Sequence, residues 1–199
     1  MAQMRERDDY YATEPKAVEL LLDLEKFDKN ILEPCCGEGH MSEVLKAAGY
    51  NVTSSDLIDR GYGEVKSLFD YEHFDGDIIT NPPYKLALDC VKKSLDLVDD
   101  GHKVAMFLKI QFLESKARKE FFEQCPPKVV YVASRKLMCA KNGDFNQYAG
   151  MAMSLVHGLS GKKATRATQS LNGLTNKIPT SNEVGISFCN YFLMSCSFT

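Results

Sequence analysis

The chain has 199 residues, of which 44% are hydrophobic, and a formal net charge of −3, so it can bury a sizeable core and is expected to form one domain. No window reaches 18 apolar residues, and the N-terminal run MAQMRERDDYY lacks the apolar region of a signal peptide. These features argue against a membrane-spanning or secreted protein, and we expect a cytoplasmic one.

Helix-like and strand-like segments alternate along the first part of the chain. Apolar residues at helical spacing and short apolar runs between turn residues predict these elements. The predicted helices span 15–27, 41–50, 85–98 and 115–125, and the predicted strands span 30–34, 51–56, 76–81, 102–110 and 128–134. Such alternation implies an α/β fold with right-handed crossovers and a doubly wound, mostly parallel sheet. Ligands of these sheets bind at the carboxyl ends of the strands.

A turn with two glycines follows the first predicted strand. The segment EPCCGEGHM (33–41) places Gly37 and Gly39 just before a helix, where backbone can approach a ligand closely. Asp56 closes the next strand, where a carboxylate can accept hydrogen bonds from both hydroxyls of a ribose. Taken separately, these residues also suit a tight turn and a helix cap. Together they indicate a cofactor that contains a nucleoside.

The same turn distinguishes between nucleoside cofactors. The third glycine of the GxGxxG pattern is missing, since Met41 and Ser42 follow His40, which disfavours nicotinamide and flavin dinucleotides. The Glu33 carboxylate would repel phosphates but attract a cationic amino group. A cofactor with a ribose, an ammonium group and no phosphate fits this pattern better.

The seven cysteines form no CxxC pair, so we expect reduced thiols in a reducing compartment rather than a disulfide frame. Cys35, Cys36 and His40 could suggest a metal site. Adjacent cysteines are poor partners in a tetrahedral zinc site, however, and we expect no metal.

The stretch DIITNPPYKL (77–86) ends a predicted buried strand with an asparagine, two prolines and a tyrosine. In order and spacing, EPCCGEGH, Asp56 and NPPY resemble the class I S-adenosylmethionine-dependent methyltransferases that methylate the exocyclic amine of adenine, with small phage and prophage DNA methyltransferases as the nearest type. The run YYATEP (10–15) resembles the Tyr-x-Thr-x-Pro-like segment that this family carries near the methionine end of the cofactor. The resemblance spans about 10–145 and implies a Rossmann-like fold, S-adenosyl-L-methionine as cofactor and DNA as partner.

The resemblance also implies roles for individual residues. The catalytic set is Asn81, Pro82, Pro83 and Tyr84. The cofactor-binding set is Tyr11, Thr13, Pro15, Glu33, Pro34, Cys35, Cys36, Gly37, Gly39, Asp56, Leu57, Asp70 and Asn81. By this analogy the Asn81 side-chain oxygen and the Pro82 carbonyl accept the two hydrogens of the target amine, and Tyr84 stacks on a base extruded from the duplex. Because each proline disfavours helix in the residue before it, the turn is expected to be extended.

Two features leave alternatives open. Where relatives carry an aspartate that reads the cofactor's adenine amine, this chain aligns Ser67, with Asp70 as a possible substitute. NPPY also positions nitrogens of RNA adenine and of protein glutamine amides, and the chain could be a remnant that folds without turnover. Read without the resemblance, NPPY is a strand-ending proline turn with a packed tyrosine.

Basic residues gather in the segment 109–141, which has eight lysines and arginines against three glutamates. A local basic face suits phosphate contact, whereas a run of charge is also typical of solvated helix surface. The candidates for nucleic-acid contact are Lys109, Lys116, Arg118, Arg135 and Lys136.

The C-terminal part departs from the resemblance. We assign 1–150 to the methyltransferase domain and 151–199 to an atypical, poorly ordered tail, because the aromatic-rich final antiparallel strand of the family is missing there or is replaced by 185–198. Reverse translation from His157 allows codons whose shifted frame reads WFVWEKGYKGDTVVKWFN and then a stop. We therefore expect that the residues from about 153 are a frameshifted translation and that the chain is marginally stable and weakly active or inactive.

Overall fold

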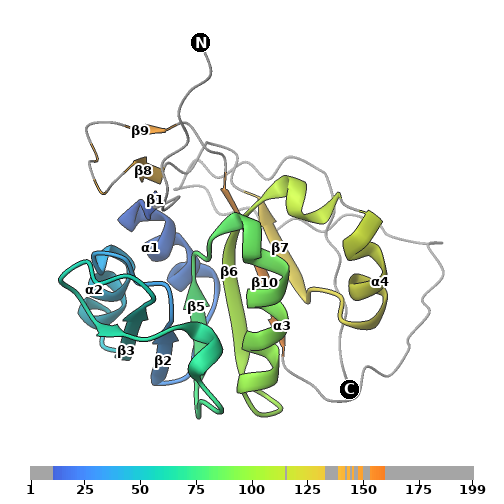
Figure 1. Ribbon diagram of the computed structural model, residues 1–199, viewed down its shortest axis with the longest axis horizontal. Helices are drawn as coiled ribbons and strands as arrows, with labels where there is room; N and C mark the ends of the chain where they lie inside the picture. Colours follow the sequence, from blue (N-terminus) through green and yellow to red (C-terminus); the bar gives the residue numbers. More distant parts are fainter. Residues whose placement is uncertain are drawn as a thin grey trace.

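The computed structural model describes residues 11–114, 116–132, 139–141, 143, 145, 148–149 and 153–159. Within these residues, the central sheet has seven strands in the order β4-β3-β2-β5-β6-β10-β7 (Figure 1). Its strands are β2 (Asn30–Glu33), β3 (Asn51–Asp56), β4 (Glu64–Val65), β5 (Asp77–Thr80), β6 (Lys103–Lys109), β7 (Val129–Val132) and β10 (Met153–Leu159). The helices are α1 (Pro15–Leu24), α2 (His40–Ala47), α3 (Ala87–Leu97) and α4 (Lys116–Gln124). None of these described helices has the length and apolar character needed to span a bilayer.

Each strand and helix expected from the sequence is present, with ends that differ by a few residues. The pairs β4–β3, β3–β2, β2–β5 and β5–β6 are all parallel, as the alternation of elements predicts. Helix α3 begins at Ala87, two residues later than expected. The reason is that Tyr84–Leu86 form a separate 3-10 turn (η2) after Pro83.

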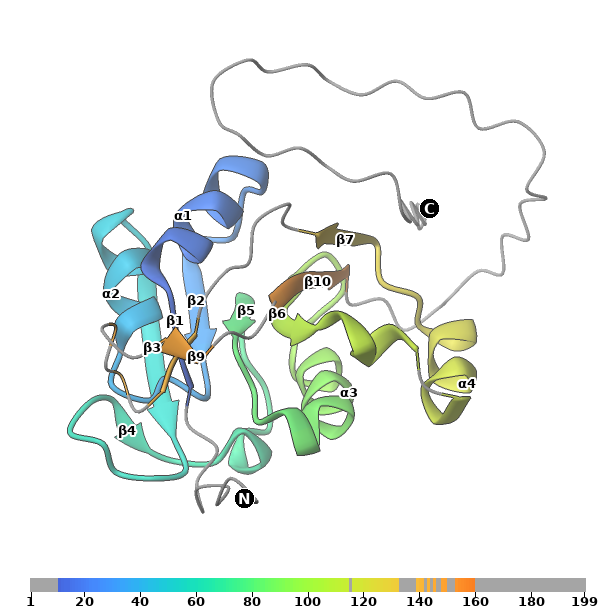
Figure 2. The same ribbon diagram turned by 90° about the horizontal axis from the view of Figure 1, so that it is seen from above.

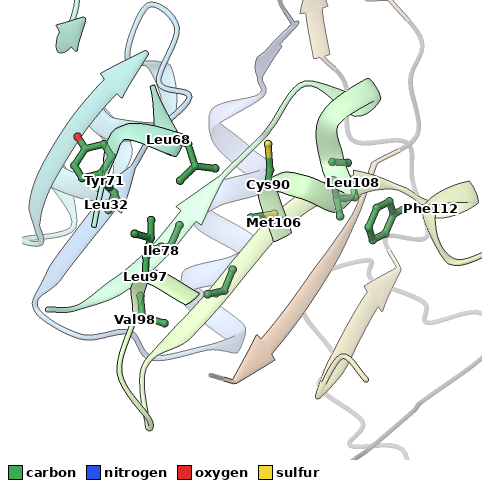
Figure 3. Close-up of a cluster of buried hydrophobic side chains, with 12 residues drawn as sticks. Leu32, Leu68, Tyr71, Ile78, Cys90, Leu97, Val98, Met106, Leu108 and Phe112 are labelled. Carbon is green, nitrogen blue, oxygen red and sulfur yellow. The ribbon is translucent and has the colours of Figure 1, made fainter. Parts of the chain in front are cut away.

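Helices cover both faces of the sheet (Figure 2), with α1 and α2 on one face and α3 on the other. Side chains of each central strand alternate between the two faces. In β6, Ala105 and Phe107 join the core beside α1 and α2, whereas Val104, Met106 and Leu108 join the core beside α3 (Figure 3). Burial on both faces explains why these strands have nearly continuous apolar sequences.

A second, smaller sheet lies at the carboxyl end of the central strands (Figure 1). It has the order β1-β8-β9, formed by β1 (Tyr11–Thr13), β8 (Cys139–Lys141) and β9 (Tyr148–Ala149). Strand β1 pairs antiparallel with β8, and Thr13 is the partner of Cys139. The sequence did not predict these short strands, although β1 lies within the family-like segment YYATEP.

The final antiparallel strand is present, so the expectation that it is missing was wrong. Strand β10 inserts between β6 and β7 and pairs antiparallel with both, from Met153 opposite Lys109 to Leu159 opposite Lys103. It lies beyond residue 150, in the segment that we assigned to the tail. Pairing of this kind uses backbone groups, so the segment MSLVHGL can fill the position without an aromatic-rich sequence. The residues from 160 onward, including 185–198, lie outside the described part.

Candidate functional site

A cavity of about 220 Å³ lies where β2, β3 and β5 end. Carboxyl ends of parallel strands meet at one edge of a sheet, which brings together segments that are far apart in the sequence. The cavity is lined by these predicted site residues: Tyr11, Thr13, Glu33, Pro34, Cys35, Cys36, Asp56, Leu57, Asn81, Pro82, Pro83 and Tyr84.

The two glycines shape the loop around the cavity without lining it. The Gly37 amide donates a hydrogen bond of 2.9 Å to Asp56 Oδ2, and its φ of 56° is in the left-handed region. Gly39 caps α2 with a φ of 84°, and a Cβ there would lie 2.5 Å from the ring of Tyr62. Its left-handed conformation and the close approach of Tyr62 both favour glycine at position 39. Pro15 also lies outside the cavity, at the first turn of α1.

Asp70 lies away from the cavity and has a different role. It caps the 3-10 turn η1 (Leu68–Asp70), in which Ser67 Oγ accepts from Phe69 N and Asp70 Oδ2 accepts from Ser67 N at 3.3 Å. Of these two residues, Ser67 lines the cavity and Asp70 does not.

Glu33 is a buried carboxyl group at the end of β2, with 2% of its surface exposed. It accepts a hydrogen bond from Ser42 Oγ, which also lies 2.6 Å from Ser54 Oγ. Burial is the main cause that raises the pKa of Glu33 to about 8, and the Ser42 hydrogen bond opposes this increase. A cationic group in the cavity would favour the ionised form.

Asp56 ends β3 and binds two loops, the glycine loop after β2 and the loop that follows β3. Its Oδ2 accepts from Gly37 N, and its Oδ1 accepts from Ile58 N at 3.0 Å. A carboxylate offers about four lone-pair sites, so each oxygen can accept a further hydrogen bond from a ligand hydroxyl.

The thiols beside the glycine loop are protonated near neutral pH. Burial raises the pKa of Cys35 above its usual range and that of Cys36 to about 12. Cys36 donates weakly to the carbonyls of Gly37 and Tyr62, each at 3.7 Å. In the described part of the chain, no group of three or more His, Cys, Asp and Glu side chains is arranged to hold a metal ion.

The NPPY segment follows β5 and is tied to the small sheet. Asn81 Nδ2 donates to the Tyr11 carbonyl at 3.2 Å and to Thr13 Oγ1 at 3.0 Å. Both amide hydrogens thus point toward β1, which leaves Oδ1 on the other side of the amide. Pro82 is buried and Pro83 is exposed, and Pro83 holds an extended ψ of 123° before η2.

Comparison with known proteins agrees with this arrangement of strands. No protein-family model and no curated protein matches the chain. Among solved structures, a Pyrococcus horikoshii protein (PH1948) proposed to be an RNA methyltransferase matches with a TM-score of 0.56 at 13% identity, over 76% of this chain and 87% of that one. A Listeria monocytogenes protein (lmo1582) proposed to be a class I S-adenosylmethionine-dependent methyltransferase matches with a TM-score of 0.55 at 11% identity, over 82% of this chain and 65% of that one.

This chain has the class I methyltransferase fold. At such low identity, the likeness concerns the fold alone. Membership of the NPPY-type adenine methyltransferases therefore depends on this chain's own residues.

Tyr84 lines the cavity and is half-buried. The ammonium of Lys109 lies 4.6 Å from the centroid of its ring. From β8, the side chain of Cys139 contacts both Tyr84 and Asn81. The ring therefore has one face near a cation, which is a favourable arrangement for an aromatic ring.

The predicted basic residues are not all alike. Lys109 ends β6 next to the cavity. The Arg118 guanidinium donates to the Gln111 carbonyl at 2.9 Å and lies 4.7 Å from the ring of Phe112, so it stabilises the start of α4. Lys116 is exposed on α4, whereas Arg135 and Lys136 lie outside the described residues.

Several residues that line the cavity were not predicted, and some of them are large apolar side chains that are exposed to solvent. Ile58, Phe69 and Leu86 expose 38%, 45% and 46% of their surface, which is high for large apolar side chains. Ile58 and Leu86 lie within two residues of predicted positions, so proximity to a motif could have indicated them. The lining residues that the sequence did not predict are Ala12, His40, Met41, Ile58, Arg60, Ser67, Leu68, Phe69, Leu86 and Cys90.

Proposed function

We propose that this chain is an S-adenosylmethionine-dependent methyltransferase that acts on the exocyclic amine of adenine in DNA. The observation that carries this proposal is the position of Asn81. Its amide lines the cavity with both hydrogens bound to β1, so its oxygen is available as an acceptor beside the Pro82 carbonyl. The class I methyltransferase fold supports S-adenosylmethionine as the cofactor in this proposal.

The cavity's chemistry fits this cofactor. Two carboxyl groups line it, and they can bind the polar ends of the molecule: Asp56 would accept from the ribose hydroxyls and Glu33 would attract the ammonium group. Leu57, Ile58 and Phe69 offer exposed apolar surface beside Asp56, which suits an adenine ring. When bound, the cofactor supplies an electrophilic methyl group on a sulfonium.

The remaining chemistry belongs to the NPPY turn. An amino group on an aromatic ring is a poor nucleophile because its lone pair is delocalised. If Asn81 Oδ1 and the Pro82 carbonyl accept its two hydrogens, the nitrogen can pyramidalise and direct the lone pair at the methyl carbon. The new N–C bond forms as the S–C bond breaks, the bonding pair goes to sulfur, and the surplus proton leaves to water. Catalysis then depends on positioning and oriented dipoles.

Tyr84 would bind the target base. Stacking on an aromatic ring contributes about 1 to 3 kcal/mol per base, and this offsets part of the few kcal/mol needed to extrude a base from a duplex. The Lys109 ammonium lies against the same ring, and in the complex it would contact a phosphate of the nucleic acid.

The substrate test uses the purified chain with S-adenosylmethionine carrying a deuterated methyl group. Duplex DNA free of N6-methyladenine, RNA of matching sequence and a glutamine-bearing protein are incubated separately, and their hydrolysates are analysed by mass spectrometry. We expect labelled N6-methyldeoxyadenosine from the DNA alone, and none with Asn81→Ala. Label in the RNA, which the resemblance to the P. horikoshii protein makes worth testing, or in glutamine would replace DNA as the substrate. No label in any sample would indicate a non-catalytic remnant.

A further inference from the structure

The Asn81 amide has two possible orientations, and the Tyr11 carbonyl on β1 selects one, because a carbonyl can only accept. Tyr11 offers a carbonyl and Thr13 a hydroxyl, at 3.2 and 3.0 Å from Nδ2. If the amide were turned over, Oδ1 would face the Tyr11 carbonyl, so two acceptors would meet. The NH2 group would then face the target amine, where two donors would meet and neither amine hydrogen would be bound.

Strand β1 is held rigidly enough to impose this choice. Thr13 exposes only 4% of its surface, and its strand partner Cys139 exposes none. The Cys139 side chain contacts Asn81 and Tyr84 as well, so β8 supports the NPPY turn directly and through β1. The small sheet therefore fixes two of the four NPPY residues.

We propose that Thr13 is a positioning residue that anchors the Asn81 amide in the orientation selected by the Tyr11 carbonyl and so presents Oδ1 to the target nitrogen. This inference rests on the proposed function. It also gives Thr13 a different role from the cofactor contact that the family resemblance implies. Thr13 acts through Asn81, and its loss should therefore affect turnover while leaving cofactor affinity unchanged.

Thr13→Val tests this role, because valine has nearly the shape of threonine but has no hydroxyl. A hydrogen bond of this kind contributes about 1 kcal/mol, so kcat should fall roughly five- to tenfold. The dissociation constant for S-adenosylmethionine, measured by calorimetry, should change less than about twofold. Thr13→Ser keeps the hydroxyl and should restore most of kcat. Thr53→Val, on the exposed part of β3, is the matched control and should behave as the unchanged chain.

Two outcomes would overturn the positioning role. In one, Thr13→Val keeps full kcat. In the other, it weakens cofactor binding as much as it lowers kcat, which would mean that Thr13 contacts the cofactor. If Thr13→Val does not fold by circular dichroism, Thr13→Ala and Thr13→Ser are compared in its place, with the same two criteria.

A second readout does not require methyl transfer, so it separates this inference from the proposed function. The side-chain amide signals of Asn81 are followed by nuclear magnetic resonance in ¹⁵N-labelled protein. We expect the two hydrogens to exchange slowly in the unchanged chain and in Thr13→Ser, and faster, with shifted signals, in Thr13→Val. Unchanged Asn81 signals in Thr13→Val would overturn the inference even if the enzyme is active. Absent methyl transfer with the expected signal changes would overturn only the proposed function.

Discussion

The two sides of the cavity are held together in different ways. On the cofactor side, the hydrogen bonds join residues that are close in sequence: Ser42 and Glu33 are 9 positions apart, and Gly37 and Asp56 are 19 positions apart. On the target side, Asn81 is bound by residues that precede it by 68 and 70 positions. The cofactor side is therefore built within one β-α-β unit, whereas the target side depends on how β1 and β8 dock against β5.

Because the two sides are built differently, some substitutions should affect cofactor binding and others turnover. Damage to the small sheet should misplace the NPPY turn while the glycine loop and Asp56 stay assembled. Damage to the unit from β2 to β3 should weaken cofactor binding first.

Asn81→Ala removes the acceptor on which the target side depends. We expect kcat to fall by at least about 100-fold, as for the loss of one well-placed group in an active site. Cofactor affinity should stay within about threefold, because Asp56 and Glu33 are untouched. Methyl-transfer rates and calorimetry measure the two quantities. Comparable loss of cofactor binding would mean that Asn81 holds the cofactor or the fold, and the two sides would then not be separable.

Glu33→Gln tests the buried carboxyl group of the cofactor side through the pH dependence of stability. The folded chain keeps Glu33 protonated up to about pH 8, whereas the unfolded chain releases that proton near pH 4.5, the ordinary pKa of a glutamic acid side chain. Between these values the folded state binds more protons, so this group makes stability fall as pH rises. Glu33→Gln should lack that fall, which amounts to roughly a few kcal/mol across the window.

Urea unfolding at pH 5 and pH 8 measures this difference. We expect the variant to gain stability relative to the unchanged chain at pH 8 and much less at pH 5. Parallel pH profiles for the two proteins would show that Glu33 titrates normally and is not the buried, protonated group that the structure indicates.

Asp56→Ala removes the predicted ribose acceptor together with its hydrogen bonds to Gly37 and Ile58. Cofactor affinity should fall roughly 10- to 100-fold, since bonds to a charged group contribute about 1.5–3 kcal/mol each. Asp59→Ala is a matched control: it removes an exposed carboxylate of the same loop that lies outside the cavity. Equal effects of the two variants would show only a general role of charge.

Strand β10 belongs to neither side of the cavity, so repairing it should change stability alone. Replacing the chain from His157 onward by WFVWEKGYKGDTVVKWFN would remove Gly158 from a strand interior, where glycine is unfavourable, and introduce aromatic and β-branched residues. We expect the melting temperature to rise by several degrees and cofactor affinity to stay constant. A lower or unchanged melting temperature would contradict the frameshift hypothesis.

Asp70→Ala should have the smallest effect. Because Asp70 caps η1 and lies outside the cavity, we expect unchanged cofactor affinity and a loss of about 1 kcal/mol in stability. Ser67→Ala is its counterpart within the cavity and should weaken binding more than Asp70→Ala. A larger loss of cofactor affinity in Asp70→Ala than in Ser67→Ala would indicate that Asp70 contacts the cofactor.

The sequence predicted the parts of the site that depend on local pattern. Gly37 and the NPPY turn come after short apolar strands and Asp56 ends β3, and parallel strands place all three at one edge of the sheet. The contact between Thr13 and Asn81 could not be predicted, because β1 has three residues and no periodicity of its own.

The sequence also misled where backbone pairing outweighs side-chain pattern. We assigned the segment Met153–Leu159 to the tail because it lacks the aromatic-rich sequence of the family's final strand. In the structure it pairs with β6 and β7 on its two sides, which satisfies its backbone groups regardless of those side chains. A similar ambiguity applies to Asp70, because a carboxylate three residues after Ser67 suits the observed capping box as well as a ligand contact.

Calorimetric titration of the purified chain with S-adenosylmethionine is the most direct test of the cavity. Since Glu33, Gly37 and Asp56 are held together by local bonds, we expect saturable binding to one site, strongly weakened in Asp56→Ala. No binding by a chain that circular dichroism shows to be folded would contradict the assignment of this cavity to the cofactor.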